Sequence, residues 1–89
     1  MRSLRVNAEE FSSRRGTHAA LRNVLGEENY FGSNLDALYD CLTSVSEPTE
    51  LRINNWSYAL KHLGGYADRL WHVLSDSTDE NPNLTIIIE

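Results

Sequence analysis

Apolar and polar positions follow two different spacings along this chain of 89 residues. Three short stretches have the composition of strands: "LRV" at 4–6, "ELRIN" at 50–54 and "LTIII" at 84–88. The middle stretch alternates, whereas the last is an unbroken apolar run, typical of a strand covered on both faces. The first strand is expected to end at "NAEE".

The segments between the strands have the spacing of helices. Helices are predicted over residues 17–26, 33–45, 56–65 and 66–81. Thr17 is a suitable first cap, and Ser33 begins the second helix in a pattern resembling a capping box, with Asn34 as the alternative cap. Glycines end the first and third helices, "EP" at 47–48 breaks the chain after the second, and Pro82 ends the last.

One side of each predicted helix is apolar and is expected to face the core. The apolar positions of the first two helices are Ala20, Leu21, Val24, Leu25, Leu35, Leu38, Leu42 and Val45, with Cys41 at the edge. In the last helix the inward positions are Ala67, Leu70, Trp71 and Leu74, and Trp56 is also expected in the core.

The predicted order is strand, helices, strand, helices, strand. Helical crossovers favour parallel strands joined by right-handed connections. The sequence therefore predicts an α/β fold with a small three-stranded parallel sheet flanked by about four helices. A chain of this length is expected to form a single domain over residues 1–89.

The composition places the chain among ordinary globular proteins, with 40% hydrophobic and 24% charged residues. Its one cysteine, Cys41, cannot form an internal disulfide, whereas small extracellular domains usually carry several pairs. The opening "MRSLRVNAEEF" lacks the apolar run of a signal peptide. No segment approaches the roughly 20 apolar residues that span a membrane. We therefore expect a cytoplasmic protein.

The net charge of −5 is unevenly distributed along the chain. Residues 27–50 contain six acids and no base, and no base follows Arg69. The acids of these two regions are Glu27, Glu28, Asp36, Asp40, Glu47, Glu50, Asp76, Asp79, Glu80 and Glu89. If the regions meet in space, they create a concentrated negative field. Nucleic acid is then a poor partner, because its phosphates require Lys and Arg, and a basic protein fits better.

Both acidic regions place carboxylates on helices. Asp36 and Asp40 are one turn apart, so they share an outward face beside Tyr39. Asp76 and Glu80 lie in the final turns of the last helix, where exposed carbonyls already produce a negative potential. Asp76 and Glu80 can be explained either by a solvated, frayed helix end or by a functional surface.

Other chemistry is poorly supported. Asp36 and Asp40 lack the pocket that a catalytic acid–base pair needs, so an enzyme is not expected. The three histidines show no ligand spacing, so neither a metal site nor a cofactor is predicted. His72 is expected to pair with Asp76, and Cys41 to be a buried apolar residue.

The stretch "YFGSNLDALYDCLT" at 30–43 closely resembles the central motif of the barstar family, intracellular inhibitors of secreted bacterial ribonucleases. The similarity extends in pattern over the whole chain. The resemblance implies a barstar-like fold and one-to-one inhibition of a guanyl-specific ribonuclease by a monomer that carries no cofactor. In that family an acidic helix blocks the basic active site of the nuclease, which gives the cell immunity to its own toxin.

The resemblance also assigns roles to residues. Asp40 is implied as the central anchor in the phosphate-binding pocket of the nuclease, and Asp36 as the partner of a second basic group. Tyr30 is implied to pack against the nuclease, and Tyr39 to support the contact. The remaining implied positions are Ser44, Val73, Asp76 and Glu80.

Four residues depart from the family pattern. Ser33 replaces an acid, Tyr39 a tryptophan, Ser44 a glycine of the type protein, and Asp76 a glutamate. These departures leave a second interpretation open, in which the same scaffold is an acidic interaction module for a basic partner that is not a nuclease.

Overall fold

The structure is a computed structural model that describes residues 1–26, 30 and 32–89. Glu27 and Glu28 of the first acid-only region, and Phe31 of the motif at 30–43, lie outside the described residues. In chain order the elements are β1 (Arg2–Asn7), a short 3-10 helix η1 (Ala8–Glu10), α1 (Arg14–Leu25), α2 (Leu35–Thr43), β2 (Thr49–Asn54), α3 (Trp56–Leu63), α4 (Gly65–Glu80) and β3 (Leu84–Ile88).

The three strands form one parallel sheet in the order β1-β2-β3. Leu4 of β1 is aligned with Leu51 of β2, which is aligned with Ile86 of β3. Because each connection between strands contains helix, the chain can return to the same end of the sheet and keep the strands parallel. The predicted α/β fold and its parallel sheet are therefore confirmed.

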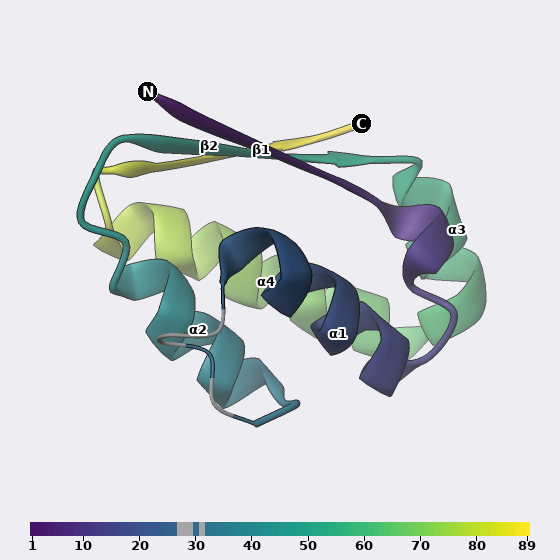
Figure 1. Cartoon of the computed structure of the whole chain (residues 1–89). Coiled ribbons are helices and arrows are strands. Elements are labelled where there is room, and N and C mark those ends of the chain that lie inside the picture. Colours follow the sequence, from purple (N-terminus) through teal and green to yellow (C-terminus); the bar gives the residue numbers. More distant parts are fainter. Residues whose placement is uncertain (27–29, 31) are drawn as a thin grey trace.

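The helices lie on one side of the sheet (Figure 1). Side chains of β2 alternate accordingly, with Leu51 and Ile53 fully buried toward the helices and Arg52 half-buried on the opposite side. The expectation that "LTIII" is covered on both faces is therefore wrong. As the edge strand of a one-sided sheet, β3 buries Leu84 but leaves Thr85 exposed.

The core forms where α2 and α4 pack together beneath the sheet. Leu38 and Leu42 of α2 are fully buried, as are Leu70 of α4 and Phe11. Trp71, predicted to face inward, is instead 45% exposed. It lines a shallow hollow together with Ile86 and Ile88 of the edge strand β3.

One predicted helix cap is wrong, and for the other helix the alternative cap is confirmed. Ser13, rather than Thr17, caps α1 by accepting a hydrogen bond from the Gly16 amide at 3.0 Å. Asn34, rather than Ser33, caps α2, since its Oδ1 accepts from the Ala37 amide at 2.8 Å. Such caps satisfy amides that have no partner within the helix, and they fix where α2 begins.

Candidate protein-binding site

The two acidic regions of the sequence meet where α2 packs on α4. Tyr39 of α2 lies at this junction, half-buried. Burial raises the pKa of its hydroxyl, and the carboxylates of Glu80, Asp76 and Asp40 raise it further. Carboxylates from both helices therefore act on one phenol. We call the surface formed by Asp36, Tyr39, Asp40, Asp76 and Glu80 the acidic face.

The carboxylates of the acidic face form no ion pair within the described part of the chain. All four are exposed. The ion pairs among the described residues join other acids to arginines: Arg2 to Glu47 at 3.5 Å, and Arg52 to Glu50 at 3.1 Å and to Glu89 at 2.7 Å. The acids of the two acid-only regions are thus of two kinds. Some form ion pairs with arginines of the same chain, and those of the acidic face do not.

The end of α4 carries negative charge where a helix favours positive charge. Its last turn contains no basic residue. The predicted pairing of His72 with Asp76 is wrong: His72 Nδ1 lies 3.0 Å from the backbone carbonyl of Asp68, one turn back along the helix. Asp76 therefore stays free on the acidic face.

Two further residues implied by the resemblance border this surface. Ser44 follows α2 with φ −92° and ψ −5°, a conformation that any residue adopts, so serine in place of glycine brings no strain. Its hydroxyl donates to the Asp40 carbonyl at 2.6 Å. Val73 is half-buried and packs against the core.

Tyr30 is placed differently from the other candidates. Its side chain is 2% exposed, and its hydroxyl is hydrogen-bonded to Nδ1 of buried His18. The hydroxyl of Tyr66 lies 2.6 Å from Nε2 of the same imidazole. A neutral imidazole has one donor and one acceptor, so it satisfies both tyrosines. Tyr30 therefore lies beneath the surface rather than on it.

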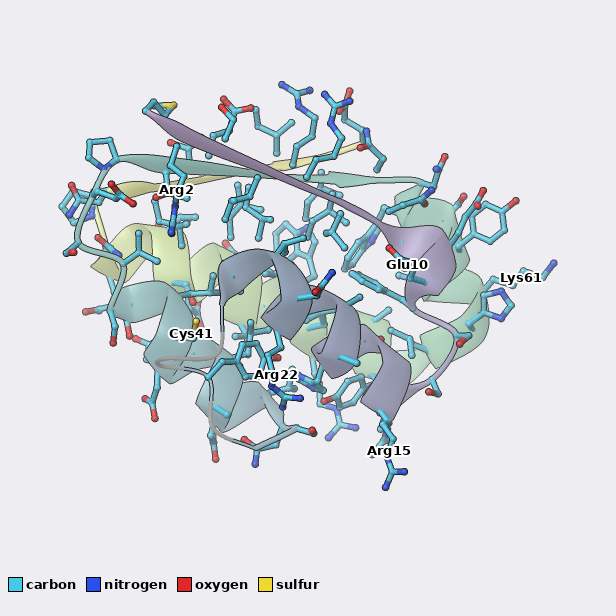
Figure 2. All side chains as sticks on the ribbon, in the orientation of Figure 1. Arg2, Glu10, Arg15, Arg22, Cys41 and Lys61 are labelled. Carbon is cyan, nitrogen blue, oxygen red and sulfur yellow. The ribbon has the colours of Figure 1, made fainter. Side chains whose placement is uncertain are left out.

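Positive charge does approach the start of α2, contrary to what the sequence spacing suggests. Arg22 donates to the Gly32 carbonyl at 2.5 Å and to Ser33 Oγ at 3.2 Å, and Figure 2 shows it on α1 beside this segment. Arg14 and Arg69 line a hollow that also contains Asp36. The acidic face is therefore bounded by arginines at one end.

The described residues give little support for a reactive cysteine, a metal site or a membrane-spanning helix. Cys41 is buried, and its burial raises the pKa of the thiol, which suits an unreactive core residue. Within residues 1–26, 30 and 32–89, no three His, Cys, Asp or Glu side chains converge as metal ligands. None of the described helices has the length and apolar content to cross a membrane.

Comparison with known proteins agrees with this architecture. The family described as "Barstar (barnase inhibitor)" matches the chain over residues 1–89. This chain belongs to the barstar family. It is also 35% identical over 91 residues to "Putative ribonuclease inhibitor YrdF" of Bacillus subtilis (strain 168), with the whole of both chains covered.

Sequence reasoning missed several residues that shape the site. Buried Asn81 links the ends of α2 and α4, and His18 holds two tyrosines. Arg14 and Arg69 reach the hollow beside Asp36 from two different helices. A polar residue just after a helix was the only hint of Asn81, and nothing in the spacing of the arginines indicates that they meet.

Proposed function

We propose that this protein inhibits a secreted bacterial ribonuclease of the guanyl-specific type inside the cell that makes it. The observation that carries the proposal is the acidic face, where exposed carboxylates from two packed helices form no ion pair among the described residues. Membership of the barstar family supports the same conclusion. The proposed inhibitor acts as a monomeric domain over residues 1–89 and binds its target one-to-one.

The proposed mechanism is occupation of the substrate site. A ribonuclease must hold a phosphodiester with basic side chains, and carboxylates can accept the same charge-assisted hydrogen bonds. Asp40, which acts on the Tyr39 phenol together with Asp76 and Glu80, is the proposed anchor for the phosphate-binding groups. Asp36, one helical turn from Asp40, and Asp76 and Glu80 on α4 would engage further basic groups. The inhibitor itself performs no chemistry.

Three residues have supporting roles in this proposal. Tyr39 fills the junction between α2 and α4, and Val73 and Ser44 border it. Tyr30 contributes from below, because its buried side chain is held by a hydrogen bond to His18. A nuclease contact with Tyr30 would then involve the edge of a ring that is 2% exposed in the free protein.

The charge on the acidic face also affects the rate of encounter. Complementary fields accelerate association of charged proteins, and the acceleration declines as salt screens the charges. This arrangement lowers the stability of the folded protein, because like charges on neighbouring helices repel. The proposal accounts for their persistence, since the missing counter-charges belong to the partner.

A second candidate is an acidic interaction module whose basic partner is not a nuclease. The observation favouring it is the start of α2, where Arg22 contacts Ser33 at a position that is acidic in the family pattern. The two candidates make opposite predictions in an inhibition assay.

The deciding experiment titrates the protein into a guanyl-specific bacterial ribonuclease while RNA cleavage is followed. It is run at low and at physiological salt. The proposal predicts loss of activity with an end point at one equivalent, reached more slowly at higher salt. Full nuclease activity at both salts with excess protein would contradict it and favour the second candidate.

A further inference from the structure

Beside the acidic face lies a hollow of about 310 Å³ with the opposite charge character. It is lined by Arg14, Ser33, Asn34, Leu35, Asp36, Tyr66 and Arg69. Three elements meet there: Arg14 begins α1, Leu35 begins α2, and Tyr66 and Arg69 belong to the first turns of α4. Asp36 lines this hollow and also belongs to the acidic face, so the two surfaces are continuous.

The two arginines are held by one aromatic ring. The guanidinium carbon of Arg14 lies 4.5 Å from the ring centroid of Tyr66, and that of Arg69 lies 5.2 Å from it. Tyr66 itself is only 7% exposed, and its hydroxyl is fixed by His18. A buried, hydrogen-bonded ring is a rigid platform, and cation–π attraction keeps both charges at the hollow.

Neither guanidinium group is used elsewhere in the described part of the chain. Arg22 donates to a backbone carbonyl, and Arg2 and Arg52 form ion pairs. By contrast, Arg14 and Arg69 donate no hydrogen bond and form no ion pair among the described residues, although Asp36 lines the same hollow. Two positive charges therefore border one hollow without a bonded carboxylate among the described residues, and an added anion would be attracted by both.

We propose that this hollow receives a carboxylate side chain of the inhibited ribonuclease, placed between Arg14 and Arg69. The inference rests on the proposed function, and it adds a requirement for the partner. A matching nuclease would carry an acidic residue at the margin of its basic site, one that faces the start of α2 when Asp36 is engaged. A nuclease with a uniformly basic rim would meet two arginines there and bind less tightly.

Reversing the charge of the two arginines gives a test in which the direction of the change in the inhibition constant is informative. Each Arg→Glu change makes the inhibitor more acidic, which at long range favours a basic partner. If the hollow is not contacted, the double variant Arg14→Glu with Arg69→Glu should inhibit as well as the parent or better. If a partner carboxylate enters it, two new like charges oppose that group, and the inhibition constant should rise about tenfold or more.

Arg15→Glu is the matched control. Arg15 lies next to Arg14 on α1, is exposed, and points away from the body of the protein (Figure 2). Arg15→Glu changes the net charge by the same amount as either single substitution at Arg14 or Arg69, at a residue that does not line the hollow. The neutral pair Arg14→Gln with Arg69→Gln should fall between parent and reversal. Thermal unfolding of each variant shows that the fold is retained.

The experiment measures inhibition constants against a guanyl-specific bacterial ribonuclease for the parent and each variant. The inference predicts weaker inhibition by the double reversal and unchanged or tighter inhibition by Arg15→Glu. Unchanged or tighter inhibition by the folded double reversal would overturn this inference and leave the proposed function intact. Absence of inhibition by the parent would overturn the proposed function, and this inference with it.

Discussion

The side-chain amide of Asn81 donates a hydrogen bond to the backbone carbonyl of Leu42, 2.9 Å away. The same amide lies 2.9 Å from the carbonyl of Val45, and its oxygen accepts from the Asn83 amide at 3.0 Å. Asn81 directly follows α4, and Leu42 lies in the last turn of α2. One buried side chain thus fastens together the ends of the two helices that form the acidic face.

Replacing Asn81 should therefore loosen the site from within. Asn81→Ala leaves two carbonyls near the core without their donor, which should lower the free energy of unfolding by about 2–3 kcal/mol. Chemical denaturation measures this change. Asn23→Ala, at an exposed position of α1, should change it by less than about 0.5 kcal/mol. Equal effects of the two substitutions would show that the link between α2 and α4 contributes little.

Buried His18 should make stability depend on pH. Burial lowers its pKa below the ordinary 6.5, and the nearby Arg22 lowers it further. Between that lowered pKa and 6.5 the unfolded chain binds more protons than the folded one, so the free energy of unfolding falls as pH falls. The slope from this one group is at most about 1.4 kcal/mol per pH unit, and it vanishes above about pH 7.

The contribution of His18 can be isolated by substitution. His18→Gln keeps a donor and an acceptor for Tyr30 and Tyr66 but does not titrate, so its stability should vary less between pH 7 and pH 5. His72→Gln, at an exposed position, should keep the parent's profile. Denaturation midpoints at a series of pH values provide the comparison. A parent profile that His18→Gln leaves unaltered would assign the dependence to other groups.

The fold was largely predictable because it depends on local periodicity. The helical spacing of α2 and the apolar run of β3 appear directly in the sequence, and helical crossovers require parallel strands. Strand order and the side occupied by the helices are not local properties. The wrong placement of Trp71 and the wrong burial of "LTIII" both follow from not knowing that β3 is an edge strand with helices on one side only.

The candidate site was predictable to a similar degree. Asp36 and Asp40 are one helical turn apart, so their shared face follows from spacing alone. Asp76 lies beside them only because α2 packs against α4. The family resemblance implied this packing, whereas the helical periodicity could not predict it. The hollow with Arg14 and Arg69 was not predicted, because the two arginines are distant in sequence. They meet at Tyr66, which belongs to no recognisable motif.

The acids at the end of α4 should reduce stability in exchange for binding. Glu80→Lys replaces a charge that opposes the helix dipole with one that complements it, and should raise the free energy of unfolding by about 0.5–1 kcal/mol. Asp68→Lys, in the first turn of the same helix, should lower it by a similar amount. Denaturation curves of both variants check the opposite signs. If Glu80→Lys is the less stable protein, the acids at this end do not strain the helix.

The same substitution should weaken inhibition, since Glu80 belongs to the acidic face. A stabilised variant that inhibits less well would separate the binding role of the carboxylate from any role in folding. Inhibition by Glu80→Lys equal to that of the parent would remove Glu80 from the proposed contact.

The most direct test of the proposed mechanism is the inhibition constant of Asp40→Asn against a guanyl-specific bacterial ribonuclease, compared with that of Asp68→Asn. Both substitutions remove one exposed carboxylate and keep the side-chain shape, so the net charge changes equally. Asp40→Asn should weaken inhibition by at least about 2 kcal/mol, roughly thirtyfold, while Asp68→Asn should change it less than threefold. If the two variants inhibit equally well, the acidic face centred on Asp40 is not what blocks the nuclease.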